Sequence, residues 1–156
     1  MKETIIYLIR HSEQLKIDNK VVKNENSQIE NEKIILSVEG ENKAKKISEL
    51  EELKDINILW CSNYVRAIAT AKYIAEKNNI EINIDENFGE RKLGDLKELE
   101  IMGKDKKHSF TTEQLLDENL KNKDGENRKE VIKRMEYSFD KIFLQNINKK
   151  IVIVSH

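Results

Sequence analysis

The sequence lacks several features that would place a chain outside the ordinary globular proteins. It has a single cysteine, Cys61, so no internal disulfide can form, and a reducing compartment is the simpler expectation. No apolar run approaches the roughly 18 residues that a membrane span requires. The apolar run at residues 5–9 is also too short for the hydrophobic part of a signal peptide. We therefore expect a cytoplasmic protein without a membrane partner.

The chain also has no large excess of charge of one sign, because it contains 28 Lys and Arg residues and 29 Asp and Glu residues, for a net charge of -1. This balance gives no basic footprint for nucleic acid, so we expect no nucleic-acid partner. Glycine is scarce, and no glycine-rich phosphate loop follows the first apolar run, which argues against a nucleotide-binding domain. We attach no functional meaning to the absence of proline.

The chain does contain enough apolar residues, 38% of 156, for the core of one domain. Four apolar segments are typical of strands. Those at 5–9, 58–61 and 151–154 are continuously apolar, which predicts strands buried on both faces of a sheet. The segment at 80–84 alternates apolar and polar residues, which predicts a half-exposed strand near an edge.

Helical patterns lie between these strands, at residues 38–53, 63–77 and 126–146, with a shorter one beginning at Thr111. Ser62 is a suitable N-cap for the second helix. Strands that alternate with helices predict an α/β fold with a mainly parallel central sheet flanked by helices on both faces. Two irregular stretches, residues 15–36 and 88–110, are typical of binding loops or lids.

Histidines follow the first and the last predicted strand. Arg10 and His11 come directly after the first apolar run, and Ser155 and His156 come after the last. In open α/β sheets, ligands bind outside the carboxyl ends of the strands. Arg66 lies one turn into the helix after the strand predicted at 58–61, and a helical side chain leans towards its N-terminus, where an anion is favoured. We therefore expect an anion site at this edge of the sheet.

Several segments, in order along the chain, resemble the motifs of the histidine phosphatase superfamily, also called phosphoglycerate mutase-like. LIRHSE resembles its Arg-His-Gly-Glu signature, and CSNYVRAIATA resembles its Ser-x-x-x-Arg-Ala-x-x-Thr-Ala stretch. ENFGERKLGDL is similar to its Glu-Arg-x-x-Gly-Asp segment, and IVIVSH to the strand before its second histidine. LSVEGENKA and GENRKEVIKR are softer matches. The resemblance implies one histidine phosphatase-like domain over 1–156, with a small irregular lid or insertion at about 88–124.

The resemblance also implies a role for each matching residue. His11 would be the nucleophile that forms a phosphohistidine, and Arg10 and Arg66 would clamp the phosphoryl oxygens. His156 would donate a hydrogen bond to the phosphoryl group, and Glu90 would protonate the leaving oxygen. No metal and no cofactor are expected, because the two arginines would repel a cation.

The implied chemistry is physically consistent. Phosphate monoesters hydrolyse very slowly in water, so most of the acceleration must come from positioning and charge. Fixed guanidinium groups suit a transition state that spreads negative charge over the equatorial oxygens. Neighbouring cations keep His11 neutral, and a bound phosphate dianion would favour the protonated form of Glu90.

The sequence also departs from the family pattern. Ser12 stands where the family has glycine and adds a hydroxyl beside the nucleophile, and we expect Ser12 and Ser62 to contact the substrate. Gln14 and Ile17 replace the usual Thr and Asn, which weakens the phosphate contacts. Family members continue past the second histidine, so we expect that the chain, which stops at His156, is truncated at its C-terminus.

These features favour a phosphatase that acts on a small phosphorylated metabolite. Phosphoglycerate mutase-type phosphoryl transfer and a non-catalytic phosphate-binding module on the same fold remain alternatives. His108, in the irregular stretch, is expected to be a loop residue, with a weaker case for binding substrate from a lid. The sequence leaves the substrate and a homodimer open.

Overall fold

The computed structural model describes residues 3–16, 27–94, 112–114 and 116–156. The chain divides into two compact units. The first contains Met1–Gly89 and Ser138–His156, and the second contains Glu90–Tyr137. The single domain with an insertion at about 88–124 stays a prediction, because these units do not decide it.

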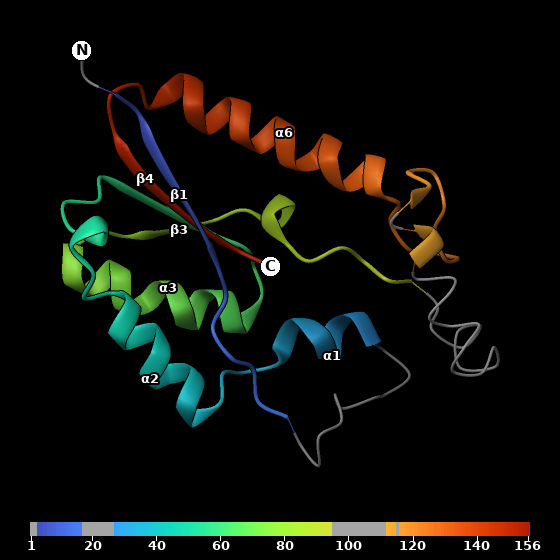
Figure 1. Ribbon diagram of the computed structural model, residues 1–156, viewed down its shortest axis with the longest axis horizontal. Helices are drawn as coiled ribbons and strands as arrows, with labels where there is room; N and C mark the ends of the chain where they lie inside the picture. Colours follow the sequence, from blue (N-terminus) through green and yellow to red (C-terminus); the bar gives the residue numbers. More distant parts are fainter. Residues whose placement is uncertain (1–2, 17–26, 95–111, 115) are drawn as a thin grey trace. The chain divides into compact units, whose positions relative to one another are not determined.

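A four-stranded parallel sheet forms the centre of the first unit (Figure 1). Its strands are β1 (Ile5–Arg10), β2 (Ile58–Cys61), β3 (Ile82–Ile84) and β4 (Lys150–Ser155), in the order β1-β4-β2-β3. β4 is an inner strand, and its four middle residues are fully buried. This explains the continuous apolar run IVIV, because an inner parallel strand is covered on both faces.

The predicted strands are present, but β1 is less buried than its sequence suggests. β1 pairs with β4 along one side, and Tyr7 and Ile9 pack against the core. Ile5 and Leu8 are 41% and 65% exposed. The prediction that β1 is buried on both faces is therefore wrong, because β1 lies at the end of the strand order. The expectation of an edge position for β3 is confirmed.

Four helices have defined bounds in the structure: α1 (Ser27–Lys33), α2 (Val38–Ile47), α3 (Val65–Asn78) and α6 (Arg128–Gln145). α3 packs against β2 and β4, and α2 packs against α3. The C-terminal part of α6, residues 138–145, lies on the other side of the sheet from α3 (Figure 1). The sheet of the first unit is therefore covered by helices on both faces, as the sequence predicts.

The core of the first unit lies between the sheet and α3. It is formed by Leu53, Ile56, Leu59, Cys61, Tyr64, Ala67, Ala71, Ile74, Ala75, Val152 and Val154. Burial raises the pKa of the Cys61 thiol to about 12. Cys61 is therefore a packing residue without thiolate character.

Several helix bounds differ from the sequence prediction. α2 ends at Ile47, because Ser48 caps it and donates its hydroxyl to the Lys45 carbonyl at 2.7 Å. The chain then forms a short 3-10 helix, η1 (Glu51–Leu53). α3 begins at Val65 with Tyr64 at the N-cap, so the prediction of Ser62 as that cap is wrong.

α1 was not predicted, since it lies within the stretch at 15–36 that we interpreted as irregular. The helix expected from Thr111 lies partly outside the described residues, although residues 112–114 are helical. No helix among the described residues is both long enough and apolar enough to cross a membrane.

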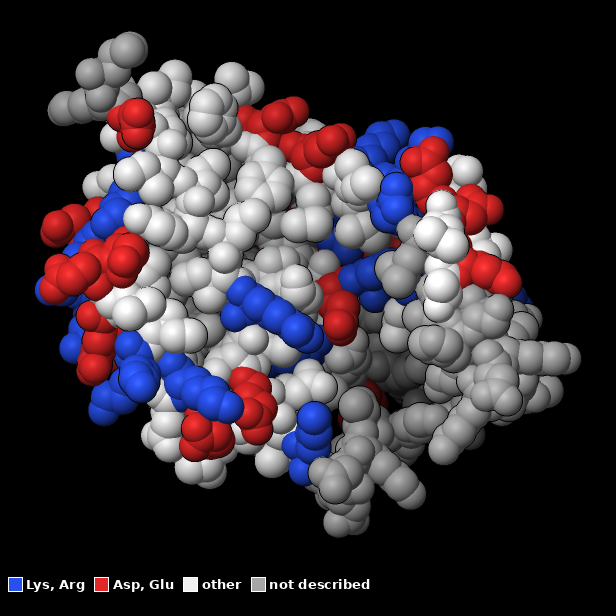
Figure 2. All heavy atoms as spheres, viewed as in Figure 1, with Lys and Arg blue, Asp and Glu red and all other residues white. Residues whose placement is uncertain are grey.

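The surface of the first unit mixes charges of both signs. Figure 2 shows Lys and Arg side chains next to Asp and Glu side chains on the side of α2 and α3. Ion pairs between these helices and their neighbours account for the mixture, including Lys43 with Glu13 at 2.7 Å and Lys72 with Glu41 at 3.6 Å. Positive and negative charges are therefore balanced on this side of the first unit, as they are in the whole sequence.

Candidate active site

The two histidines from opposite ends of the chain meet at the carboxyl edge of the sheet. Their ring centroids are 5.0 Å apart. The parallel register brings this about, because Arg10 pairs with Ser155 and the His11 amide donates to the Ser155 carbonyl at 2.8 Å. The Ser62 amide donates to the Val154 carbonyl at 3.1 Å, so β2 ends at the same level.

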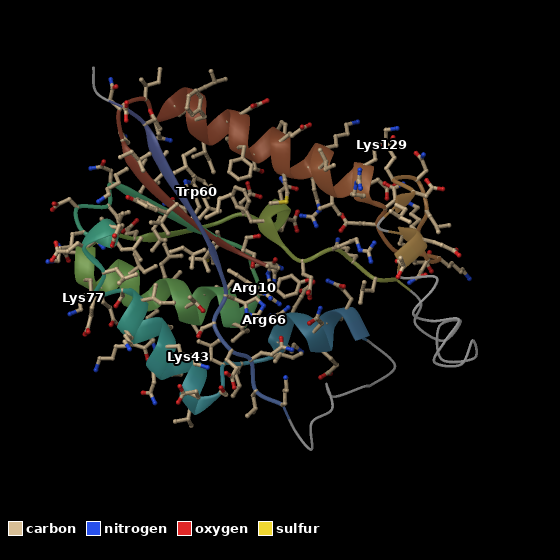
Figure 3. All side chains as sticks on the ribbon, in the orientation of Figure 1. Arg10, Lys43, Trp60, Arg66, Lys77 and Lys129 are labelled. Carbon is tan, nitrogen blue, oxygen red and sulfur yellow. The ribbon has the colours of Figure 1, made fainter. Side chains whose placement is uncertain are left out.

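Arg66 joins the two imidazoles from the first turn of α3. Its Nε donates to His11 Nε2 at 3.2 Å, and its Nη2 contacts His156 Nδ1 at 3.3 Å. The residue is only 1% exposed. Its guanidinium carbon lies 4.6 Å from the centroid of the Tyr64 ring, which suits a cation over an aromatic face. Figure 3 shows Arg66 where α3 begins, beside α1.

These contacts decide the tautomer of each histidine, because an arginine can only donate. His11 Nε2 accepts from Arg66, so its proton is on Nδ1, which donates to the Ser12 carbonyl at 2.6 Å. His156 Nδ1 accepts in the same way, so its Nε2 donates to Ser62 Oγ at 2.8 Å. In this arrangement, a proton on the accepting nitrogen of either ring would face the guanidinium. His11 therefore directs a lone pair of Nε2 towards Arg66.

The turn that carries His11 is held by polar contacts from two helices. The Ser12 amide donates to Thr70 Oγ1 at 2.9 Å, and the Thr70 hydroxyl donates to the Arg66 carbonyl at 2.8 Å. The Ser12 hydroxyl donates to the Gly40 carbonyl at 2.7 Å. The hydroxyl that replaces the family glycine thus fastens the turn to α2.

Gly40 allows α2 to approach this turn closely. A Cβ atom at this position would lie 2.0 Å from the Glu13 carbonyl oxygen. The same oxygen accepts a hydrogen bond from the Ser37 amide at 2.9 Å, and Ser37 caps α2 by accepting from the Gly40 amide. Only glycine fits this approach without moving the backbone of the His11 turn.

The sequence prediction missed several residues of this cluster. Tyr64 is 2% exposed, its ring lies 4.4 Å from that of His156, and its hydroxyl accepts from Gln28 Nε2 at 2.8 Å. The Asn31 carbonyl accepts from Arg66 Nη1 at 2.5 Å. Thr70 could have been found from its position one turn after Arg66 in RAIATA. Gln28 and Asn31 could not, because α1 itself was not predicted.

These contacts do not decide the roles of two further predicted site residues, Arg10 and Glu90. Arg10 is exposed at the end of β1, next to His11 in the chain, and its clamping role stays a prediction. Glu90 is the first residue of the second unit, and its role as proton donor stays a prediction. Ile17 and His108 lie outside the described residues.

The arrangement suits covalent transfer of an anionic group better than metal chemistry. It provides an unprotonated imidazole nitrogen, a second imidazole and a buried guanidinium within one cluster. Among the residues that the structure describes, no three His, Cys, Asp or Glu side chains are placed to hold a metal ion.

Two comparisons with known proteins give matches. A family model for the histidine phosphatase superfamily (branch 1) matches residues 6–156. The solved structure of mycobacterial glucosyl-3-phosphoglycerate phosphatase is 18% identical and has a TM-score of 0.77, over 96% of this chain and 72% of that chain. Alpha-ribazole phosphatase from Shigella flexneri is 20% identical with a TM-score of 0.72, over 97% and 73%.

Bacillus stearothermophilus YhfR is 21% identical with a TM-score of 0.75, over 98% of this chain and 74% of that chain. At these identities, the likeness to solved structures establishes the fold alone. A search of curated proteins gives no match.

Proposed function

Because the chain belongs to branch 1 of the histidine phosphatase superfamily, we propose that it hydrolyses phosphomonoesters of small metabolites through a phosphohistidine on His11. The observation that carries this proposal is the pair of hydrogen bonds made by the His11 ring. Its Nδ1 proton is held by the Ser12 carbonyl, and its Nε2 lone pair lies in the cluster that contains Arg66 and His156. A neutral imidazole oriented by a second contact is what nucleophilic catalysis requires.

In the first step, His11 Nε2 attacks phosphorus, a P–N bond forms and the P–O bond to the leaving group breaks. Arg66 neutralises the charge on the phosphoryl oxygens. His156 donates a hydrogen bond from its Nε2 to one of them in place of its contact with Ser62, keeping its proton, and Arg10 adds a second guanidinium. Glu90 gives its proton to the leaving oxygen, as the family resemblance implies.

In the second step, water attacks the phosphohistidine. Glu90 takes a proton from the water, the P–N bond breaks, and the electron pair returns to His11 Nε2. Inorganic phosphate leaves, and both residues regain their starting protonation states. The step needs no metal, because the guanidinium groups supply the positive charge.

The test is hydrolysis of an aryl phosphate ester in the presence of EDTA. The His11→Asn variant keeps an amide near the Nδ1 position but has no nucleophile, so we expect its rate to fall by more than about a thousandfold. The intact mass of the wild type, measured without acid immediately after mixing with the aryl phosphate, should show one added phosphoryl group. The His11→Asn variant should lack it. Equal rates for the two proteins would refute the proposal.

The substrate is best sought among phosphorylated metabolites with a sugar or polyol part. Two similar structures are named for glucosyl-3-phosphoglycerate and α-ribazole phosphate, so these two esters begin the screen. Release of inorganic phosphate is the readout. Transfer of the phosphoryl group to a second position of the product, without release, would instead indicate a mutase.

A further inference from the structure

In the structure, the Arg66 guanidinium already donates a hydrogen bond to a carbonyl oxygen of this chain. Its Nη1 donates to the Asn31 carbonyl at 2.5 Å, while its Nε and Nη2 face the two histidines. With 1% of its surface exposed, Arg66 is buried among its partners. An anion must therefore displace a partner before the guanidinium can bind it.

Among the described partners of Arg66, the carbonyl oxygen of Asn31 is chemically most similar to a phosphoryl oxygen. It lies in the last turn of α1, where carbonyl groups lack intrahelical partners and the helix dipole places partial negative charge. A backbone donor to this carbonyl, the Ile34 amide, is 3.4 Å away. Arg66 therefore supplies the stronger contact at the C-terminal end of α1, as basic residues do at many helix ends.

A second contact holds the same face of α1 against the cluster. Gln28 lies three residues before Asn31, so the two share one face of the helix. Gln28 Nε2 donates to the Tyr64 hydroxyl at 2.8 Å. The Tyr64 ring in turn contacts both the guanidinium of Arg66 and the imidazole of His156. α1 is thus seated on the catalytic cluster at two points.

From these contacts we infer that α1 is a strap that competes with substrate phosphate for Arg66. In the seated state, the Asn31 carbonyl occupies the guanidinium. When a phosphate dianion arrives, it takes over Nη1, and the C-terminal end of α1 leaves Arg66. This inference rests on the proposed function, because it concerns access to the same phosphoryl site.

Competition of this kind has a defined thermodynamic consequence. A ligand that binds only the open state has an apparent affinity reduced by the fraction of open molecules. A change that weakens the seating of α1 without touching Arg66 must therefore tighten phosphate binding. The loss of one neutral hydrogen bond changes an equilibrium constant by about two- to tenfold.

The first experiment measures binding of inorganic phosphate by calorimetry. Gln28→Ala and Tyr64→Phe each remove the Gln28–Tyr64 bond, from opposite sides, and Tyr64→Phe keeps the ring over Arg66. We expect each variant to bind phosphate about two- to tenfold more tightly than the wild type. The double variant should bind no more tightly than Gln28→Ala, which already removes this bond together with the bond from Gln28 to Glu32.

The matched control is Gln145→Ala, which removes the same side chain from an exposed position in the last turn of α6. Its phosphate affinity should equal that of the wild type. Unchanged or weaker binding by Gln28→Ala and Tyr64→Phe would overturn the inference. So would the absence of phosphate binding by every variant, because an unseated α1 should leave Arg66 available.

The second experiment measures amide hydrogen exchange of residues 27–33 with and without saturating phosphate. A strap that is displaced should exchange faster when phosphate is bound, whereas a lid that closes over the ligand should exchange more slowly. Slower exchange would overturn the inference. Neither experiment depends on turnover, so a protein that binds phosphate competitively but hydrolyses nothing would refute the phosphatase proposal and leave the strap intact.

Discussion

Replacing Gly40 by alanine has two opposite effects on the stability of the protein, one from helix propensity and one from steric overlap. Gly40 is the third residue of α2, where helix propensity alone predicts that alanine stabilises the protein by about 1 kcal/mol. The new Cβ would, however, lie 2.0 Å from the carbonyl oxygen and 2.9 Å from the carbonyl carbon of Glu13. Both are backbone atoms, so α2 or the turn after β1 must move.

The movement would break two hydrogen bonds between α2 and the turn, from the Ser12 hydroxyl to the Gly40 carbonyl and from the Ser37 amide to the Glu13 carbonyl. Their loss costs about 1 kcal/mol each, and crowding of a packed site adds about 1–3 kcal/mol. After the gain in helix propensity, we expect a net destabilisation of about 2–4 kcal/mol.

Urea unfolding and thermal unfolding measure this change, and in a chain of this length it corresponds to a decrease in Tm of about 5–15 °C. The control is Asn42→Ala, an exposed position of the same helix, where alanine should be neutral or slightly stabilising. Turnover of an aryl phosphate should fall with Gly40→Ala, because the displaced turn carries His11. A Gly40→Ala protein as stable as the wild type would refute the close approach of α2 to the turn.

Two further predictions concern single polar groups. Thr70→Val keeps the shape but leaves the Ser12 amide without its acceptor, which should cost about 1–3 kcal/mol in urea unfolding and lower kcat, while Thr70→Ser should retain both. Burial would raise the pKa of Glu126, but two hydrogen bonds from Arg134 and one from the Lys92 amide outweigh it and lower this pKa. The stabilisation is therefore complete above the pKa of Glu126 in the unfolded chain and is lost as pH falls through the lower, folded-state pKa. Glu126→Gln should destabilise the second unit by about 2 kcal/mol at pH 7; a difference between the two proteins that does not shrink as the solution is acidified would contradict this.

The sequence was most informative about the strands. β4 could be located because four consecutive β-branched residues are suited to an inner parallel strand, and β4 is that inner strand. β1 has a similar run, yet it lies at the end of the strand order with Leu8 largely exposed. An apolar run reports that a strand can be buried, whereas neighbours that are distant in the sequence decide how much of it is covered.

Helix ends were less predictable, because local hydrogen bonds decide them. The apolar spacing of residues 38–53 favoured one helix, but the Ser48 hydroxyl satisfied the Lys45 carbonyl and ended α2. α1 was missed, since SQIENEK has only one apolar residue and no stripe that would predict a packed face. Its seating depends on polar contacts with Tyr64 and Arg66 instead.

The sequence by itself determined that His11 and His156 end parallel strands, and parallel strands place their carboxyl ends at one edge. That rule needs only the order of strands and helices along the chain. Only the tertiary structure decided which atoms Arg66 contacts, because its partners come from residues 35, 55 and 90 positions away in the sequence. The tautomers of both histidines, and the acceptor that α1 offers in place of an anion, follow from those long-range contacts.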